Sequence, residues 1–138
     1  MSLDTNKRLV RAYFDAFRDR DEGWWDANIA PDFVRHDPGL DFEVRGPDGI
    51  RKLAAVLHGG LSEVAIPIDE IIAEGDRVLA RLWFQGRHTG EFQGIPPTGK
   101  SVDIVVMDYF RVADGILAEH WALMDNLTML KQIGAVDL

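Results

Sequence analysis

Asp108 and His120 are the two residues whose types and spacing best support proton-transfer chemistry. They flank residues 113–115 (ADG), which match a three-residue hairpin loop with glycine in the left-handed position. Such a loop pairs Val112 with Ile116, and counting back along both strands places Asp108 opposite His120. The sequence therefore predicts a carboxylate and an imidazole side by side on one face of a hairpin.

The predicted pair lies in apolar surroundings. The same face carries Val106, Phe110, Ala118, Ala122 and Met124, and of these we expect Phe110, Ala122 and Met124 to contact a ligand. Burial shifts the pKa of an acid or an imidazole, while each group stabilises the charged form of the other. We interpret the pair as catalytic, with a purely structural ion pair as the alternative. A two-residue turn at residues 114–115 would instead place Tyr109 opposite His120.

Three further residues are candidate ligand contacts. His36 ends a short predicted strand and precedes a turn at residues 37–39, so it is expected at the mouth of a cavity, although Asp37 is equally suited to bonding the turn itself. His88 has the same parity as Leu82 and Phe84, which favours the inner face. Trp25 offers a flat wall for an aromatic ligand, with simple core packing as the alternative.

The remaining pattern predicts the elements that position these residues. Apolar spacing predicts helices over residues 5–20, 21–29, 46–60 and 125–134, and alternation predicts strands over 33–36, 64–68, 78–84, 102–112 and 116–124. Residues 89–100 are expected to form a loop. Helices followed by a meander of strands indicate an α+β fold, with the helices across one face of a curved antiparallel sheet.

The opposite face of the predicted hairpin is also apolar. It carries Val105, Met107, Tyr109, Leu117, Trp121 and Leu123, interrupted by Asp103, Arg111 and Glu119. Because large apolar patches on soluble proteins usually mark contacts, this face predicts a homodimer formed through the sheet.

Composition narrows the class of protein. With 138 residues we expect one domain spanning residues 1–138, and the net charge of −8 argues against nucleic acid and anionic membranes as partners. The chain has no cysteine and four histidines without metal-binding spacing, so no metal site is predicted. No signal pattern or apolar run of membrane-spanning length is present, and we expect a cytoplasmic protein.

Several motifs together resemble the SnoaL-like polyketide cyclase family over about residues 5–134. They are residues 30–39 (APDFVRHDPG), 46–50 (GPDGI), 86–92 (GRHTGEF), 94–100 (GIPPTGK), 110–115 (FRVADG) and 119–121 (EHW). The resemblance implies an NTF2-like cone, in which helices cover the concave face of the sheet and enclose a cavity, and which is often dimeric through the sheet.

The resemblance also implies a chemistry that needs no metal or cofactor. Characterised cyclases of this family close a ring of an aromatic polyketide by an intramolecular aldol condensation, with an Asp as acid/base. That Asp stands two residues after the His that matches His120, where this sequence has Ala122, and the family's His on the preceding strand matches Asp108. We expect Asp108 to act as the base beside His120, with Asp125 as the alternative if it does not simply cap the last helix.

Three functions follow from these residues. The first is a cyclase or isomerase that acts on a small hydrophobic, polycyclic or ketone-bearing molecule by acid/base chemistry. The second is a non-catalytic protein that binds a small molecule, which Ala122 favours. The third resembles an epoxide hydrolase, which needs an Arg between two Asp; here Arg111 and Asp108 have opposite parity, so this triad is not expected to assemble.

Overall fold

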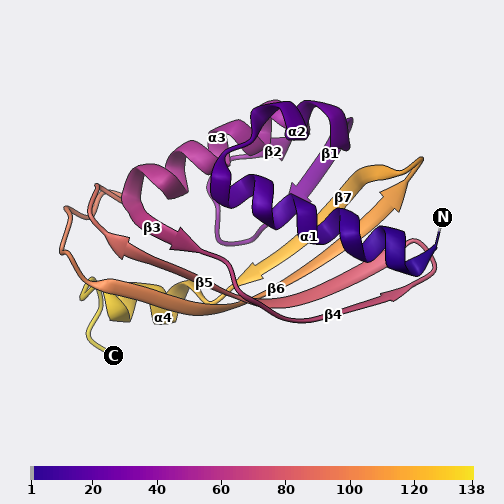
Figure 1. Cartoon of the computed structure of the whole chain (residues 1–138). Coiled ribbons are helices and arrows are strands. Elements are labelled where there is room, and N and C mark those ends of the chain that lie inside the picture. The colour runs from indigo at the N-terminus through magenta and orange to yellow at the C-terminus, as the bar shows by residue number, and fades with distance from the viewer. Residues whose placement is uncertain (1) are drawn as a thin grey trace.

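The chain folds into a strongly curved sheet with three helices on one side of it (Figure 1). The computed structural model describes residues 2–138. The helices on that side are α1 (Leu3–Asp19), α2 (Glu22–Asn28) and α3 (Gly46–Gly60). A fourth helix, α4 (Asn126–Gln132), follows the last strand and packs beside the sheet. The α+β class expected from the sequence is confirmed.

Helix α1 presents its apolar positions to the concave face of the sheet. Val10, Tyr13, Phe14 and Phe17 recur at helical spacing and are all buried. The helix begins at Leu3, two residues before the predicted start, because Ser2 is its N-cap and accepts a hydrogen bond from the backbone N–H of Thr5. Tyr13 lies in the middle part of this helix and faces the sheet.

The sheet has seven strands, and its long central strands carry most of the inner surface. In spatial order the path is β2-β1-β7-β6-β5-β3, and β4 also pairs with β5. The strands are β1 (Ile29–His36), β2 (Val44–Arg45), β3 (Leu61–Ala65), β4 (Ile68–Glu74), β5 (Arg77–His88), β6 (Ser101–Ala113) and β7 (Ile116–Met124). The predicted strand over residues 64–68 is divided, because Pro67 lies between β3 and β4.

One strand pair departs from the expected antiparallel sheet. Strand β1 runs parallel to β7, and the register places Arg35 beside His120 and His36 beside Trp121. All other pairs are antiparallel. The parallel pair joins segments far apart in the sequence, which local alternation does not reveal.

The β6–β7 hairpin has a different register from the predicted one. Its turn has two residues, Asp114 and Gly115, both with positive φ, as a type I′ turn requires. Val112 then pairs with Leu117 and Arg111 with Glu119, so Ala118 is an extra, bulged residue. The bulge restores the alternation that the short turn would have reversed.

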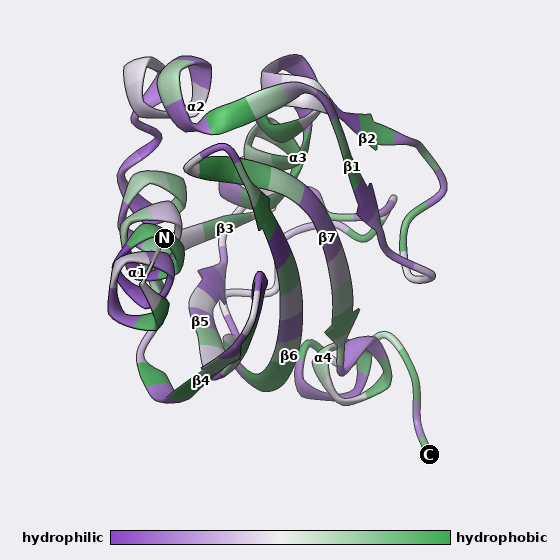
Figure 2. Cartoon of the chain, turned by 90° about the vertical axis from the view of Figure 1, so that its right-hand side faces the viewer, coloured by the Kyte–Doolittle hydropathy of each residue, from purple (hydrophilic) through white to green (hydrophobic). Residues whose placement is uncertain are grey.

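The hydrophobic core lies between the concave face and the helices. Side chains of alternating residues in β5, β6 and β7 point inward and are buried against α1 and α3. Figure 2 shows how these strands curve, with apolar segments along them. Leu117, which was predicted on the outer face, is fully buried because the bulge turns it inward. Among residues 2–138 no helix is long and apolar enough to cross a membrane.

Candidate functional site

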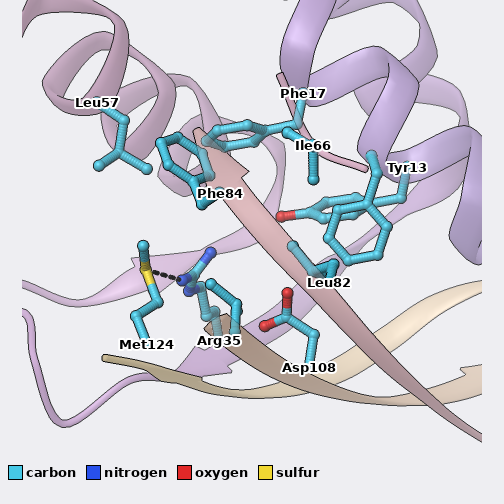
Figure 3. A pocket seen from close by; sticks show the side chains of 11 residues that line it. Tyr13, Phe17, Arg35, Leu57, Ile66, Leu82, Phe84, Asp108 and Met124 are labelled. Atoms are coloured by element: carbon cyan, nitrogen blue, oxygen red, sulfur yellow. Dashed lines mark hydrogen bonds between the residues drawn. The ribbon is translucent and has the colours of Figure 1, made fainter. Parts of the chain in front are cut away.

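A small cavity lies between α1 and the concave face of the sheet (Figure 3). Its volume is about 20 Å³, which is room for roughly one water molecule. Most of its lining is apolar or aromatic, and the polar exceptions are Tyr13, Arg35 and Asp108. In Figure 3 the ends of these three side chains converge on the same space. The other lining residues are Phe14, Phe17, Leu57, Ile66, Leu82, Phe84, Val106 and Met124.

Asp108 and His120 form a buried hydrogen-bonded pair, as the sequence predicted. The Nε2 atom of His120 lies 2.8 Å from Oδ1 of Asp108, and both side chains are almost completely shielded from solvent. The register differs from the expected one, because Asp108 is paired with Ala122 and His120 with Phe110. The two side chains therefore meet diagonally across the strands, on the same face.

The two members of the pair have different positions relative to the cavity. Asp108 lines it, whereas His120 lies behind Asp108 and is enclosed by aromatic rings. Phe110 stacks on the imidazole with a centroid distance of 4.0 Å, and Tyr13 meets it edge to face at 5.8 Å. A proton on its way to or from a ligand would therefore pass through Asp108, not directly through His120.

Burial keeps His120 neutral. It lowers the pKa of His120 below the usual value, and the nearby Asp108 carboxylate only partly opposes this effect. A neutral imidazole bonded to a carboxylate through Nε2 carries its proton on that nitrogen. The other nitrogen, Nδ1, is buried without a hydrogen-bond partner among the described residues. His120 therefore donates a hydrogen bond to one oxygen of Asp108 and holds that carboxylate in place.

Arg35 is a site residue that the sequence interpretation missed. Its side chain is buried, and its Nη2 atom donates to Oδ2 of Asp37 at 2.8 Å. Burial works against the positive charge, but the acidic groups around it, Tyr13, Asp108 and Asp37, keep the pKa of the guanidinium above its usual value. The alternation of Phe33 with Arg35 in β1 was the available signal, because a large apolar residue at 33 points residue 35 inward as well.

Tyr13 brings a second unsatisfied polar group to the cavity. Its hydroxyl is buried and makes no hydrogen bond within the described residues. Burial raises the pKa of Tyr13 to about 12, with the Arg35 guanidinium acting in the opposite direction. The hydroxyl therefore keeps its proton at neutral pH and is available to a ligand as a hydrogen-bond donor.

Two of the predicted ligand contacts lie beside the cavity and one lines it. Met124 contributes directly to the lining, and its sulfur lies 3.6 Å from Nη2 of Arg35. Phe110 and Ala122 are buried next to the pair, Phe110 stacked on His120 and Ala122 paired with Asp108 across the strands. They shape the surroundings of the pair without lining the cavity.

The expected position of His36 is wrong. Alternation in β1 points Arg35 inward and His36 outward, where His36 stacks on Trp121 and bonds Glu119 at 2.7 Å. Asp37, next to it, is the residue that reaches the buried side, and it also accepts a hydrogen bond from the backbone of Gly39. The turn and the buried ion pair are thus formed by the same carboxylate.

His88 and Trp25 are buried outside the cavity lining. His88 faces inward, as predicted, but its Nδ1 atom accepts from the backbone of Thr98 and lies 2.9 Å from the Thr98 hydroxyl. It fixes the loop over residues 89–100 against the end of β5. Trp25 is fully enclosed in the core. Neither side chain is in contact with the cavity.

Two other acidic or basic candidates have structural partners. Asp125 caps α4, accepting hydrogen bonds from the backbone and the hydroxyl of Thr128. Arg111 bonds Glu119 at 3.2 Å on the outer face, as its parity predicted. The triad of Arg111 with Asp108 therefore does not assemble, as expected; a different arginine, Arg35, bonds Asp37 and lines the cavity together with Asp108.

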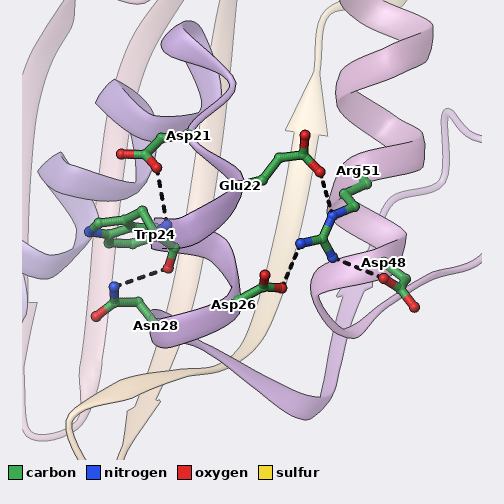
Figure 4. Close-up of polar contacts among 7 residues, drawn as sticks. All are labelled: Asp21, Glu22, Trp24, Asp26, Asn28, Asp48 and Arg51. Atoms are coloured by element: carbon green, nitrogen blue, oxygen red, sulfur yellow. Dashed lines mark hydrogen bonds and ion pairs between the residues drawn. The ribbon is translucent and has the colours of Figure 1, made fainter.

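A charged cluster joins α2 to α3 at the surface (Figure 4), and none of its residues lines the cavity. Arg51 of α3 bonds Glu22 and Asp26 of α2 at 2.7 and 2.6 Å, and Asp48 of its own helix at 2.9 Å. This arginine ties α2 to α3 at the surface. Within residues 2–138 no group of three or more His, Asp or Glu side chains is arranged to hold a metal ion.

Comparison with solved structures defines the class of fold. TsrD from Streptomyces laurentii superposes with a TM-score of 0.86 at 27% identity and covers 99% of both chains. Wild-type IdmH from Streptomyces antibioticus gives a TM-score of 0.83 at 31% identity, covering 94% of this chain and 98% of IdmH. These neighbours and the curled sheet with its enclosing helices define an NTF2-like fold.

The sequence comparisons identify the family. The model of the SnoaL-like polyketide cyclase family matches residues 7–133. Aklanonic acid methyl ester cyclase DnrD from Streptomyces peucetius is 30% identical over 135 residues, which cover 96% of this chain and 90% of DnrD. Aklanonic acid methyl ester cyclase DauD from Streptomyces sp. (strain C5) is also 30% identical over 135 residues, covering 81% of DauD. The chain belongs to the SnoaL-like polyketide cyclase family, as its motifs indicated.

Proposed function

We propose that this protein closes a ring in an enolisable, ketone-bearing molecule by an intramolecular aldol reaction, with Asp108 as the proton carrier. The observation that carries this proposal is the Asp108 carboxylate, which faces an apolar cavity while the buried His120 holds its Oδ1 atom at 2.8 Å. A base in surroundings that exclude water is suited to removing a proton next to a carbonyl group.

The register supports the assignment of Asp108. In the cyclases that this sequence resembles, the catalytic Asp occupies the position of Ala122, and Ala122 is the cross-strand partner of Asp108. Cross-strand partners have neighbouring side chains on one face. A carboxylate at 108 therefore reaches nearly the same part of the cavity as a carboxylate at 122, from the adjacent strand.

The proposed reaction needs no group besides the substrate and Asp108. The ionised carboxylate takes a proton from the carbon beside a ketone, and the resulting enolate carbon forms a bond to a second carbonyl carbon of the same molecule. The alkoxide so formed takes the proton back from Asp108, so the product is an isomer of the substrate. His120 is a positioning residue, because it contacts Asp108 and not the cavity.

A direct test uses aklanonic acid methyl ester, the compound named for DnrD and DauD. Product formation is followed by chromatography, since ring closure leaves the mass unchanged. We expect Asp108→Asn to lower the rate by about 100-fold or more, the usual scale for a general acid/base. The matched control is Asp103→Asn on the same strand, where Asp103 is exposed and bonds Gln85. Equal rates in both variants would refute the role of Asp108.

A second candidate function is binding without chemistry, and Ala122 is the observation that favours it. The alanine leaves the position of the family's catalytic Asp without a carboxylate. An apolar pocket with a few polar groups suits binding as well as turnover. Thermal stabilisation by aklanonic acid methyl ester without any product would support this function over the first.

A third candidate is the addition of water to an epoxide, which the position of Arg35 favours. Asp37 bonds this guanidinium, Asp108 lines the same cavity, and the cavity is large enough for a water molecule. Formation of a diol from limonene oxide, lost in Asp108→Asn, would support this function. Absence of the diol under conditions where aklanonic acid methyl ester is converted would exclude it.

A further inference from the structure

We propose that Arg35 and Tyr13 form a site for a negatively charged oxygen of the ligand, which makes enolates and phenolates the preferred ligand class of this cavity. The role of this site in catalysis rests on the proposed function. Binding of an anion at the site does not depend on turnover. Both side chains line the cavity, and each has a buried polar atom that no described residue satisfies.

The unsatisfied atoms are the first observation. Nε of Arg35 and Oη of Tyr13 are buried without a hydrogen-bond partner among residues 2–138, although buried polar groups are nearly always bonded. Leaving such a donor unpaired costs free energy that a ligand can recover. Both can donate a hydrogen bond, one of them from a charged group, and two unpaired donors on side chains that line one cavity favour an acceptor that carries negative charge.

The strand register explains why Arg35 is held in this place. Parallel pairing of β1 with β7 sets Arg35 beside His120, and β6 brings Asp108 to the same side. Asp37 fixes the guanidinium through Nη2, which leaves Nε to face elsewhere. The arginine is therefore anchored before a ligand arrives, so that binding does not require its long side chain to be ordered.

Charge balance links this site to Asp108. Before reaction the negative charge is on Asp108, and after proton transfer it is on the oxygen of the enolate. Arg35 is close enough to Asp108 for their charges to interact, and it faces the same cavity. Proton transfer thus moves a negative charge from one neighbour of the guanidinium to another and creates no new unpaired charge in an apolar site.

The ligand must open the cavity to reach these donors. A volume of about 20 Å³ does not hold a ring, but Leu57 lines both the cavity and a groove of about 730 Å³ on the outside. The groove runs along Leu40, Phe42, Lys52, Val56 and Phe92. We expect displacement of the Leu57 side chain to join the two spaces, since rotamer changes of this kind are common on binding.

The test compares 4-nitrophenolate with nitrobenzene, its neutral analogue, by equilibrium titration of the whole protein at a pH where the phenol is ionised. We expect wild type to bind nitrophenolate more tightly than nitrobenzene. Tyr13→Phe removes only the unpaired hydroxyl, so it should fold, and it should weaken nitrophenolate binding about tenfold or more while leaving nitrobenzene unchanged.

Arg35 is tested together with its partner. Arg35→Gln alone would leave the Asp37 carboxylate buried and unpaired, so the variant Arg35→Gln with Asp37→Asn removes both charges at once. It should abolish the preference for the anion, and the control Arg111→Gln on the outer face should keep it.

Three results would overturn the anion site. They are no binding of nitrophenolate by wild type, equal or tighter binding of nitrobenzene, and equal loss of both probes in Tyr13→Phe. The outcome is separate from that of the cyclisation assay. If the protein prefers nitrophenolate but does not convert aklanonic acid methyl ester, the anion site is supported and the proposed function is refuted. If it converts the ester but does not prefer nitrophenolate, the function is supported and the anion site is refuted.

Discussion

Replacing His120 by Gln should remove a pH dependence of stability that the buried imidazole imposes. Burial lowers the pKa of His120 below 6.5, its value in an unfolded chain. As the pH falls through 6.5, the unfolded chain binds a proton at this position while the folded protein does not. Folding stability is therefore greatest above pH 6.5 and decreases towards acid, by at most about 1.4 kcal/mol per pH unit.

The size of the effect follows from complete burial. If the folded imidazole binds no proton, the loss between neutral pH and pH 5.5 is about 1.4 kcal/mol, which is the free energy of protonating the unfolded imidazole. His120→Gln keeps an N–H group that can donate to Asp108 but cannot titrate. The free energy of unfolding of the variant should change less than that of wild type over this range.

Urea unfolding at pH 7.5, 6.5 and 5.5 measures the difference. The control is His36→Gln, which replaces a half-exposed imidazole on the outer face. Glu119 and Asp125 have lowered pKa values, so they add their own pH dependence only in more acidic solution. An identical slope for wild type and His120→Gln would show that the buried imidazole does not resist protonation, and would refute the electrostatic description of the site.

Three further predictions concern other parts of the molecule. Tyr13 should ionise near pH 12 in the folded protein, and stability should fall as the pH rises from 10 towards 12; absorbance titration of Tyr109→Phe reports this tyrosine alone, and a midpoint near 10 in the folded state would contradict it. We also propose that the exposed outer face forms a homodimer, so light scattering should give a dimer for wild type and a monomer for Leu123→Glu; a monomeric wild type at micromolar concentration would refute the dimer. Arg51→Met should lower the melting temperature at low salt, and the difference should shrink as salt screens the ion pairs; a difference that salt does not change would assign it to packing.

The hairpin shows how far local sequence patterns can predict this site. The turn was predicted with three residues and has two, which by itself would have placed Asp108 and His120 on opposite faces. The bulge at Ala118 reverses that shift, so the two side chains meet as expected although the pairing differs. The apolar alternation around both residues was the reliable signal, because burial of one face fixes which side chains share it.

Arg35 shows what local patterns cannot supply. Its neighbours His120 and Asp108 come from strands about 70 to 85 positions further along the chain, and the parallel pairing of β1 with β7 has no local signature. Alternation from Phe33 would still have pointed Arg35 inward and His36 outward. The partners of a buried charge depend on the tertiary arrangement, whereas its direction can be obtained from the strand itself.

The most direct test of the central claim is proton exchange at the carbon next to the ketone. Aklanonic acid methyl ester is incubated in D₂O with wild type, Asp108→Asn or Asp103→Asn, and deuterium at that carbon is measured by mass spectrometry at early times. If Asp108 is the proton carrier, wild type and Asp103→Asn exchange the proton faster than buffer does, and Asp108→Asn is slower by about 100-fold or more. Exchange by Asp108→Asn at the rate of wild type would contradict the account.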